Sequence, residues 1–206
     1  MENLNFILYI SIAAPLSMML FICKEKLRRF IIFFLAGMTA CVFSGEIVGV
    51  IINKLNISLE YVVTNITPVL EEVCKAIPIV FFALVLQPKR QVLLECAFAV
   101  GVGFAVQENA YILANYSTDA SLILAIVRGF GAGILHGTCA LGVGYGMSFF
   151  YTRRKMAVPC TTALLTATVV YHSIYNMLLL TYGSITAVIT VPVFVGIVIS
   201  IKKYYK

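Results

Sequence analysis

Long apolar runs separated by short polar breaks dominate the chain. A helix needs about 20 mainly apolar residues to cross the hydrocarbon core of a bilayer. Runs of this kind predict membrane-spanning helices at about 5–23, 30–52, 61–86, 92–115, 121–151, 157–182 and 184–201. The pattern therefore predicts an all-α, polytopic transmembrane bundle of about seven spans, which forms a single integral membrane domain over residues 1–206.

The basic residues fall in alternate breaks between these runs. They cluster at 24–29, 89–90, 153–155 and 202–206, and the breaks between these clusters carry almost none. Because Lys and Arg accumulate in cytoplasmic loops, we expect the N-terminus outside and the C-terminus in the cytoplasm. The net charge of +6 thus reports topology in the lipid bilayer and gives no support for nucleic acid as a partner.

Composition agrees with this interpretation. Hydrophobic residues make up 61% of the chain and charged residues 12%, which is far from the usage of soluble domains. Small residues also recur at every fourth position in two runs, a spacing typical of close helix packing in lipid. The two stripes are Gly129, Gly133 and Gly137, and Ala97, Gly101 and Ala105. The second stripe, extended by three residues, reaches Glu108, which we therefore expect to face protein.

The third run contains the densest polar cluster, Glu71-Glu72-Val73-Cys74-Lys75. Ionisable groups at the centre of a membrane cost roughly 2.5–3.5 kcal/mol each on insertion scales, so they are functional candidates. Glu71 and Lys75 are four residues apart on one helix face, and we expect them to pair. Glu72 points about 100° away around the helix and needs a separate partner, which makes it the carboxylate of greater interest.

Two prolines, Pro68 and Pro78, bracket this cluster. Each removes a backbone hydrogen bond, and we expect the carbonyls of Thr64 and Cys74 to be freed. One interpretation is a kinked helix, and the other is that the kinks open room for water and extended substrate backbone beside the glutamates.

Further polar residues lie in the fourth, fifth and sixth runs. At 1.5 Å per residue, most of them fall about 9–17 Å below the outer surface, and His136 about one turn deeper. This layer comprises Glu71, Glu72, Glu108, Arg128, His172 and Asn176. His172 and Asn176 are one turn apart on a common helix face. We therefore expect one polar site in the outer half of the membrane.

Carboxylates, imidazoles and an amide in one pocket suit hydrolysis by an activated water. A glutamate would accept the proton, with Lys75 or Arg128 offsetting its burial, and His172 and Asn176 would stabilise the oxyanion. A divalent metal such as zinc would have ligands in Glu72, Glu108, His136 and His172, but no HExxH-type spacing is present. Metal-assisted and metal-free hydrolysis both stay open.

Two other function classes use similar residues. A row of buried carboxylates and histidines is also what a proton-coupled or cation-coupled transporter or channel needs, although the sequence shows no inverted repeat. The other alternative is a non-catalytic relative that binds and shields a membrane partner.

Four segments between about 61 and 180 give the chain a family resemblance. They are EEVCK at 71–75, GFAVQENAYIL at 103–113, the segment from Arg128 through His136 to Gly144, and YHSIYNM at 171–177. In this order they resemble the EExxK, Glu-Asn, Arg-His-Gly and HxxxN/D segments of the PrsW family of intramembrane proteases. That family is distantly related to the CAAX prenyl endopeptidase and bacteriocin-processing (CPBP) membrane enzymes.

The resemblance implies an intramembrane endopeptidase of the bacterial cell membrane. Its substrates would be membrane-tethered proteins, anti-sigma factors among them, cut near the outer face. The water-activating base would be Glu71 or Glu72. The rest of the site would comprise Glu108, His136, His172 and Asn176, supported by Lys75, Asn109 and Arg128. CAAX-type relatives have a His where this chain has Glu108, so prenyl-protein processing is the weaker inference.

Overall fold

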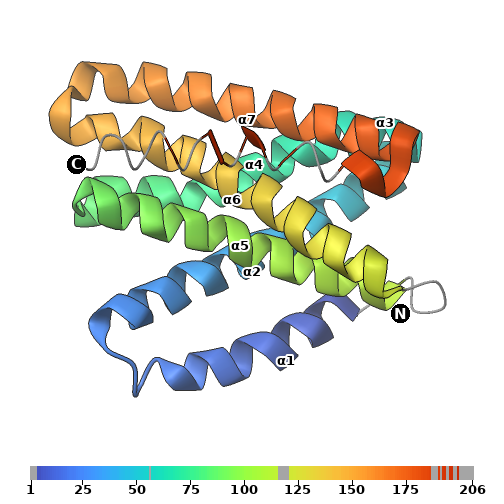
Figure 1. Cartoon of the computed structure of the whole chain (residues 1–206), viewed down its shortest axis with the longest axis horizontal. Helices are drawn as coiled ribbons and strands as arrows, with labels where there is room; N and C mark the ends of the chain where they lie inside the picture. Colours follow the sequence, from blue (N-terminus) through green and yellow to red (C-terminus); the bar gives the residue numbers. More distant parts are fainter. Residues whose placement is uncertain are drawn as a thin grey trace.

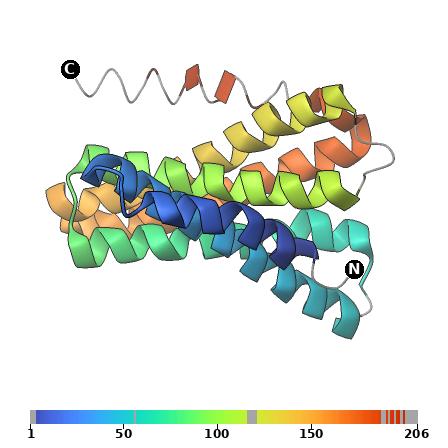
Figure 2. The ribbon, with the colours of Figure 1, turned by 90° about the horizontal axis from the view of Figure 1, so that it is seen from below.

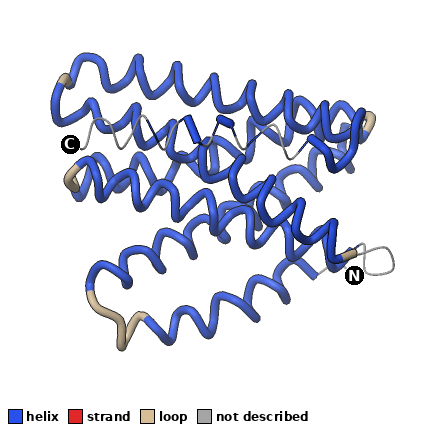
Figure 3. The backbone as a smooth tube through the Cα atoms, in the orientation of Figure 1, coloured by secondary structure: helices blue, strands red, loops and turns tan. Residues whose placement is uncertain are grey.

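In the computed structural model, the described part of the chain consists of helices joined by short loops (Figures 1 and 3). The structure describes residues 4–55, 57–115 and 121–186, and a few residues between 190 and 199. The elements are α1 (Leu4–Met19), α2 (Glu25–Leu55), α3 (Leu59–Tyr61), η1 (Val62–Ile66), α4 (Thr67–Phe81), η2 (Phe82–Leu86), α5 (Arg90–Asn115), α6 (Leu122–Thr152), α7 (Arg154–Tyr182) and η3 (Gly183–Thr186). The predicted all-α class is confirmed.

Four helices, α2, α5, α6 and α7, are long and apolar enough to cross a membrane. The apolar helix α1 is shorter, with 16 residues. Helical backbone also continues from Leu59 to Leu86 through α3, η1, α4 and η2, which matches the predicted run 61–86. The last predicted span, 184–201, lies mainly outside the described residues, so the count of about seven remains a prediction.

Helix α5 lies at the centre of the bundle. It packs against α2 on one side and α6 on the other, and α7 packs on α6. Helix α4 contacts α2, α5, α6 and α7, so it packs within the same bundle (Figures 1 and 2). The helical segments α2, Leu59–Leu86, α5, α6 and α7 alternate in direction. The basic segments that precede α2, α5 and α7 therefore lie at the same end of the bundle, on the left in Figure 1. This end is called the basic end below.

Glycines allow the central helices to approach closely. A Cβ on Gly37 of α2 would overlap the Val100 carbonyl of α5, and one on Gly103 of α5 would overlap the Phe34 carbonyl of α2. On the other side of α5, a Cβ on Gly101 would overlap the backbone of His136. Small residues therefore set both interfaces of α5, as is typical of helix packing in membranes.

The predicted glycine stripe of α6 is only partly used for packing. Gly137 lies against the ring of Phe98, but an added Cβ on Gly129 or Gly133 would meet no atom of the described residues within 4 Å. Among the described residues, the expected helix packing is therefore found for Gly137 and not for Gly129 and Gly133. The backbone of α6 comes closest to α5 at His136 and Gly137, where it meets Gly101.

The apolar core fills the half of the bundle toward the basic end. It contains buried side chains from α2, α4, η2, α5 and α6, among them Phe33, Ile79, Phe82, Leu93 and Val100. The Tyr151 hydroxyl of α6 donates a hydrogen bond of 2.6 Å to the Ala83 carbonyl in η2. This contact joins the C-terminal end of α6 to η2 at the edge of the core. The predicted polar site residues lie in the other half of the bundle.

Candidate active site

Four helices contribute the predicted site residues. Glu71, Glu72 and Lys75 come from α4, Glu108 and Asn109 from α5, Arg128 and His136 from α6, and His172 and Asn176 from α7. All but Asn176 are joined in one set of side-chain contacts, described below. The structure thus brings together residues that are far apart in the sequence, such as Glu72 and His172, which are 100 positions apart.

Lys75 and Glu72 form a buried ion pair. Lys75 Nζ lies 2.6 Å from Glu72 Oε1, and the two side chains are 1% and 0% exposed. The expected pair of Glu71 with Lys75 is therefore wrong, and so is the expectation that Glu72 needs a partner other than Lys75. Positions three and four apart are both neighbours on a helix. Lys75 also reaches His136 Nδ1 at 2.8 Å, and this second contact holds it on the Glu72 side.

The His172 ring lies between the two glutamates of α4. Its Nδ1 is 2.8 Å from Glu72 Oε1, and its Nε2 is 3.7 Å from Glu71 Oε2. A carboxylate only accepts hydrogen bonds, so this geometry assigns the proton of the neutral ring to Nδ1. The lone pair of Nε2 then faces Glu71.

Both ring nitrogens of His136 have partners. The Lys75 ammonium donates to Nδ1, which places the proton of the neutral ring on Nε2, 3.1 Å from Glu108 Oε2. The ring of Phe104 packs against His136 in a tilted arrangement at a centroid distance of 4.9 Å, and Lys75 Nζ lies 4.7 Å from the centroid of the Phe104 ring. His136 and His172 meet edge to face at 5.0 Å. The imidazoles are therefore held by packing as well as by hydrogen bonds.

Arg128 and Asn109 secure the open side of the site. Arg128 Nη2 donates to Glu108 Oε2 at 3.3 Å, and its Nε donates to Asn109 Oδ1 at 3.0 Å. Asn109 Nδ2 in turn donates to the Arg128 carbonyl at 3.2 Å. The amide thus fixes both the side chain and the backbone of Arg128, which agrees with a supporting role.

Asn176 makes its contact outside this set. Its Nδ2 donates to the Val63 carbonyl at 3.0 Å. Val63 lies in the π-turn η1, five residues before Pro68, which has no N–H to donate. In a π-turn, each carbonyl pairs with the N–H five residues later, and not four residues later as in an α-helix. Pro68 therefore frees the carbonyl of Val63 and not that of Thr64, and Asn176 donates to the Val63 carbonyl. The second N–H of the amide has no part in this contact.

The group Glu71, His136 and His172 fits a metal ion. One ligand atom from each lies within 4.8 Å of the others, and all three residues are buried. Glu71 Oε2 is a buried oxygen without a hydrogen-bond partner among the described atoms. Two imidazoles, one carboxylate and an open position are a donor set typical of catalytic zinc. An ion on His136 would replace one of its two present contacts.

The candidate ligands thus differ from those predicted. Glu71 takes the place of Glu72 and Glu108 beside the two histidines. Glu72 instead accepts the Nδ1 proton of His172, as carboxylates behind metal-binding histidines do. Glu108 lies beside Arg128 and His136.

Sequence reasoning missed two buried residues of α5. Phe104 lies four residues before Glu108, so helical spacing places it on the same face. Gln107, which is 0% exposed, donates to Asn5 Oδ1 at 2.8 Å and to the Asn5 carbonyl at 3.0 Å. It anchors α1 beside the site, and a glutamine inside an apolar run was the available signal.

Carboxylates and imidazoles that meet inside a bundle of helices long and apolar enough to cross a membrane are typical of a polytopic membrane protein with a buried polar site. Residues 25–201 match the family described as PrsW family intramembrane metalloprotease. The chain belongs to this family, as its motifs predicted. No curated protein and no solved structure matches the chain.

Proposed function

We propose that this protein is an endopeptidase that hydrolyses peptide bonds of membrane-tethered proteins, with Glu71 as the proton acceptor for the attacking water. The observation that carries the proposal is the buried Oε2 of Glu71, which has no hydrogen-bond partner among the described atoms and lies 3.7 Å from His172 Nε2. A carboxylate with a free lone pair beside an imidazole can take a proton from water and deliver it to the leaving amine.

The neighbouring residues keep this pair in position. Glu72 accepts the hydrogen bond from His172 Nδ1–H, so His172 Nε2 faces Glu71, where the attacking water would bind. Lys75 neutralises Glu72, which would otherwise be a buried charge without compensation. Glu72 therefore acts as a positioning residue, and Glu71 becomes the first candidate for the base.

In a metal-assisted reaction, Glu71, His136 and His172 would instead hold a divalent metal, zinc being the ion that this donor set favours, and Glu71 would then be a ligand and not the base. When bound, such an ion supplies Lewis-acid polarisation of the substrate carbonyl. The second N–H of Asn176 is the candidate donor to the oxyanion that develops during attack. His172 has no N–H for this role, because its Nδ1 proton goes to Glu72 and its Nε2 lone pair faces Glu71.

The positions of these residues along their helix axes support a site away from the basic end. On α5, Glu108 lies about 27 Å along the helix from Arg90 but only about 10 Å from Asn115. If the basic end faces the cytoplasm, the N-terminus is outside, the chain crosses the bilayer about seven times and the site is in the outer half. A single-span protein, such as an anti-sigma factor of a bacterial cell membrane, would then present its outer juxtamembrane segment.

The test uses purified protein reconstituted with a tethered single-span substrate, with fragments followed by gel and mass spectrometry. Glu71→Gln keeps the shape of the side chain but removes the proton acceptor, so cleavage should fall by about 10²–10⁴-fold. Glu46→Gln, a change at an exposed carboxylate of α2, is the matched control and should cleave like wild type.

A chelator should leave cleavage unchanged when Glu71 acts as the free base, whereas a loss of cleavage that added zinc restores would identify the metal-assisted reaction with Glu71 as a ligand. Unchanged cleavage by Glu71→Gln would overturn the role of Glu71. Proton or cation flux into vesicles that is lost in Glu71→Gln, without any proteolysis by wild type, would overturn the protease assignment in favour of a transporter.

A further inference from the structure

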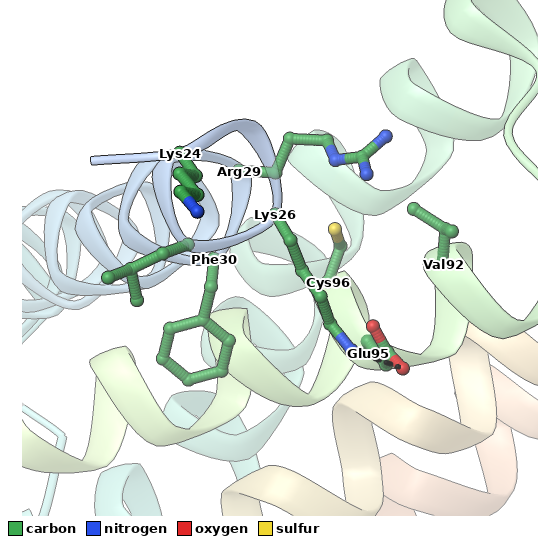
Figure 4. A pocket seen from close by; sticks show the side chains of 8 residues that line it. Lys24, Lys26, Arg29, Phe30, Val92, Glu95 and Cys96 are labelled. Carbon is green, nitrogen blue, oxygen red and sulfur yellow. Dashed lines mark ion pairs between the residues drawn. The ribbon is translucent and has the colours of Figure 1, made fainter.

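A second site lies at the basic end of the bundle, between the first turns of α2 and α5 (Figure 4). It is a cavity of about 590 Å³. Apolar side chains line it from both helices, Leu27 and Phe30 from α2 and Val92 and Cys96 from α5. Cys96 is about 18 Å along α5 from Glu108, so the cavity is separate from the candidate active site.

The polar lining of this cavity has an excess of positive charge. Lys24, Lys26 and Arg29 line it together with one acid, Glu95. Lys26 Nζ lies 3.6 Å from Glu95 Oε1 across the pocket, and both side chains remain partly exposed (Figure 4). Exposed ion pairs of this kind contribute little stability and exchange partners readily.

The other two cations are less compensated. Arg29 lies 3.4 Å from Glu25, a neighbour on the same helix that does not line the cavity. The Lys24 side chain forms no ion pair within the described part of the chain. The lining therefore offers positive charge to an anionic ligand.

The surroundings of the cavity are those of a membrane surface. Phe21 and Ile22, in the turn just before Lys24, are 92% and 89% exposed. Large apolar side chains without protein neighbours, directly beside a cluster of Lys and Arg, are typical of segments at the boundary between lipid and water. The cavity thus opens where phospholipid headgroups lie.

We propose that this cavity binds one anionic phospholipid. The headgroup phosphate lies between Lys24 and Arg29, and the upper part of an acyl chain lies along Leu27, Phe30 and Val92. The apolar walls below the cations favour a lipid over soluble phosphate, which has nothing to place there. Basic pockets between transmembrane helices bind acidic headgroups in this way. The bound lipid joins α2 to α5.

The experiment measures lipid binding by native mass spectrometry of the purified full-length chain. The probes are phosphatidylglycerol and phosphatidylcholine with identical acyl chains, and soluble glycerol phosphate is the competitor. Wild type should retain phosphatidylglycerol at least tenfold more strongly than phosphatidylcholine. Lys24→Gln/Arg29→Gln should weaken phosphatidylglycerol about 30-fold, because each cation near the surface contributes about a factor of five.

The matched control is Arg153→Gln/Lys155→Gln, which removes the same charge from the same end of the bundle but outside the cavity. It should leave binding within about twofold of wild type. Leu27→Trp, at a half-exposed wall position, fills the cavity without changing charge and should weaken phosphatidylglycerol about tenfold. Thermal unfolding of each variant in detergent verifies that it is folded.

Three results would overturn the proposal. The first is equal retention of both lipids by wild type, a test that needs no variant. The second is an equal loss in the pocket and control pairs, which would reduce the effect to general surface charge. The third is evidence for a soluble-anion site. Either displacement of the lipid by glycerol phosphate at equal concentration or full binding of phosphatidylglycerol by Leu27→Trp would give this evidence.

Discussion

The two halves of the bundle use the same helices in different ways. Toward the basic end, α4 and α5 contribute Ile79 and Leu93 to a buried apolar core. Toward the other end, the same two helices contribute Glu72, Lys75 and Glu108 to a chain of charged contacts. Gly101 marks the boundary, since its lack of a Cβ lets α5 touch the backbone of His136.

The difference shows that the two halves obtain their order from different forces. The apolar half depends on volume, so removing a methylene leaves a void but no unpaired group. The polar half depends on reciprocal contacts, so removing one partner leaves another buried and unpaired. Substitutions in the two halves should therefore separate stability from catalysis.

The largest effect on stability is expected from Lys75→Met, which keeps the length of the side chain but leaves Glu72 without its ion pair. Breaking a buried pair costs about 3–5 kcal/mol. The midpoint of thermal or denaturant unfolding in detergent measures this loss. Lys26→Met removes an exposed Lys–Glu pair and should cost at most about 1 kcal/mol. Equal losses in the two variants would show that the buried pair has no special role.

A smaller effect on stability is expected from Gly101→Ala, at the boundary between the halves. The new Cβ would overlap the His136 carbonyl, so α5 and α6 must separate. Overpacking of this kind costs about 1–3 kcal/mol, and the shift of His136 should lower the cleavage rate at least tenfold. Unfolding midpoints and cleavage rates are measured on the same preparation.

The control for this change is Gly129→Ala, where an added Cβ meets no atom of the described residues within 4 Å. Alanine is favoured over glycine in a helix by about 0.5–1 kcal/mol, so this variant should be as stable as wild type or slightly more stable. A Gly101→Ala protein that behaves like the control would contradict the close contact of α5 with His136.

The smallest effect is expected from Ile79→Val in the apolar half, which deletes one buried methylene. The unfolding free energy should fall by about 0.5–1.5 kcal/mol, with the cleavage rate unchanged at a temperature where the variant is folded. A large loss of cleavage at full folding would show that the apolar half takes part in the reaction.

Hydropathy and spacing predicted much of this arrangement. Apolar runs and basic breaks located the helices because lipid forces every backbone polar group into a helical hydrogen bond. The cost of buried charge singled out Glu71, Glu72, Lys75, Glu108 and Arg128 without any knowledge of their contacts.

Partner choice within the site was not predictable from spacing alone. Lys75 had carboxylates three and four residues away, and His136 on another helix decided between them. The π-turn η1 moved the freed carbonyl from Thr64 to Val63, which accepts a hydrogen bond from Asn176. The choice of Glu71 over Glu72 as the proposed base depends on His172, which lies between the two.

The most direct measurement is the mass of the fragments that the reconstituted protein releases from a single-span substrate. The account predicts one cut, in the part of the substrate that faces the half of the bundle away from the basic end, made by wild type and Glu46→Gln but not by Glu71→Gln or His172→Ala. Cleavage that persists in Glu71→Gln and His172→Ala, or a cut at the basic end, would contradict it.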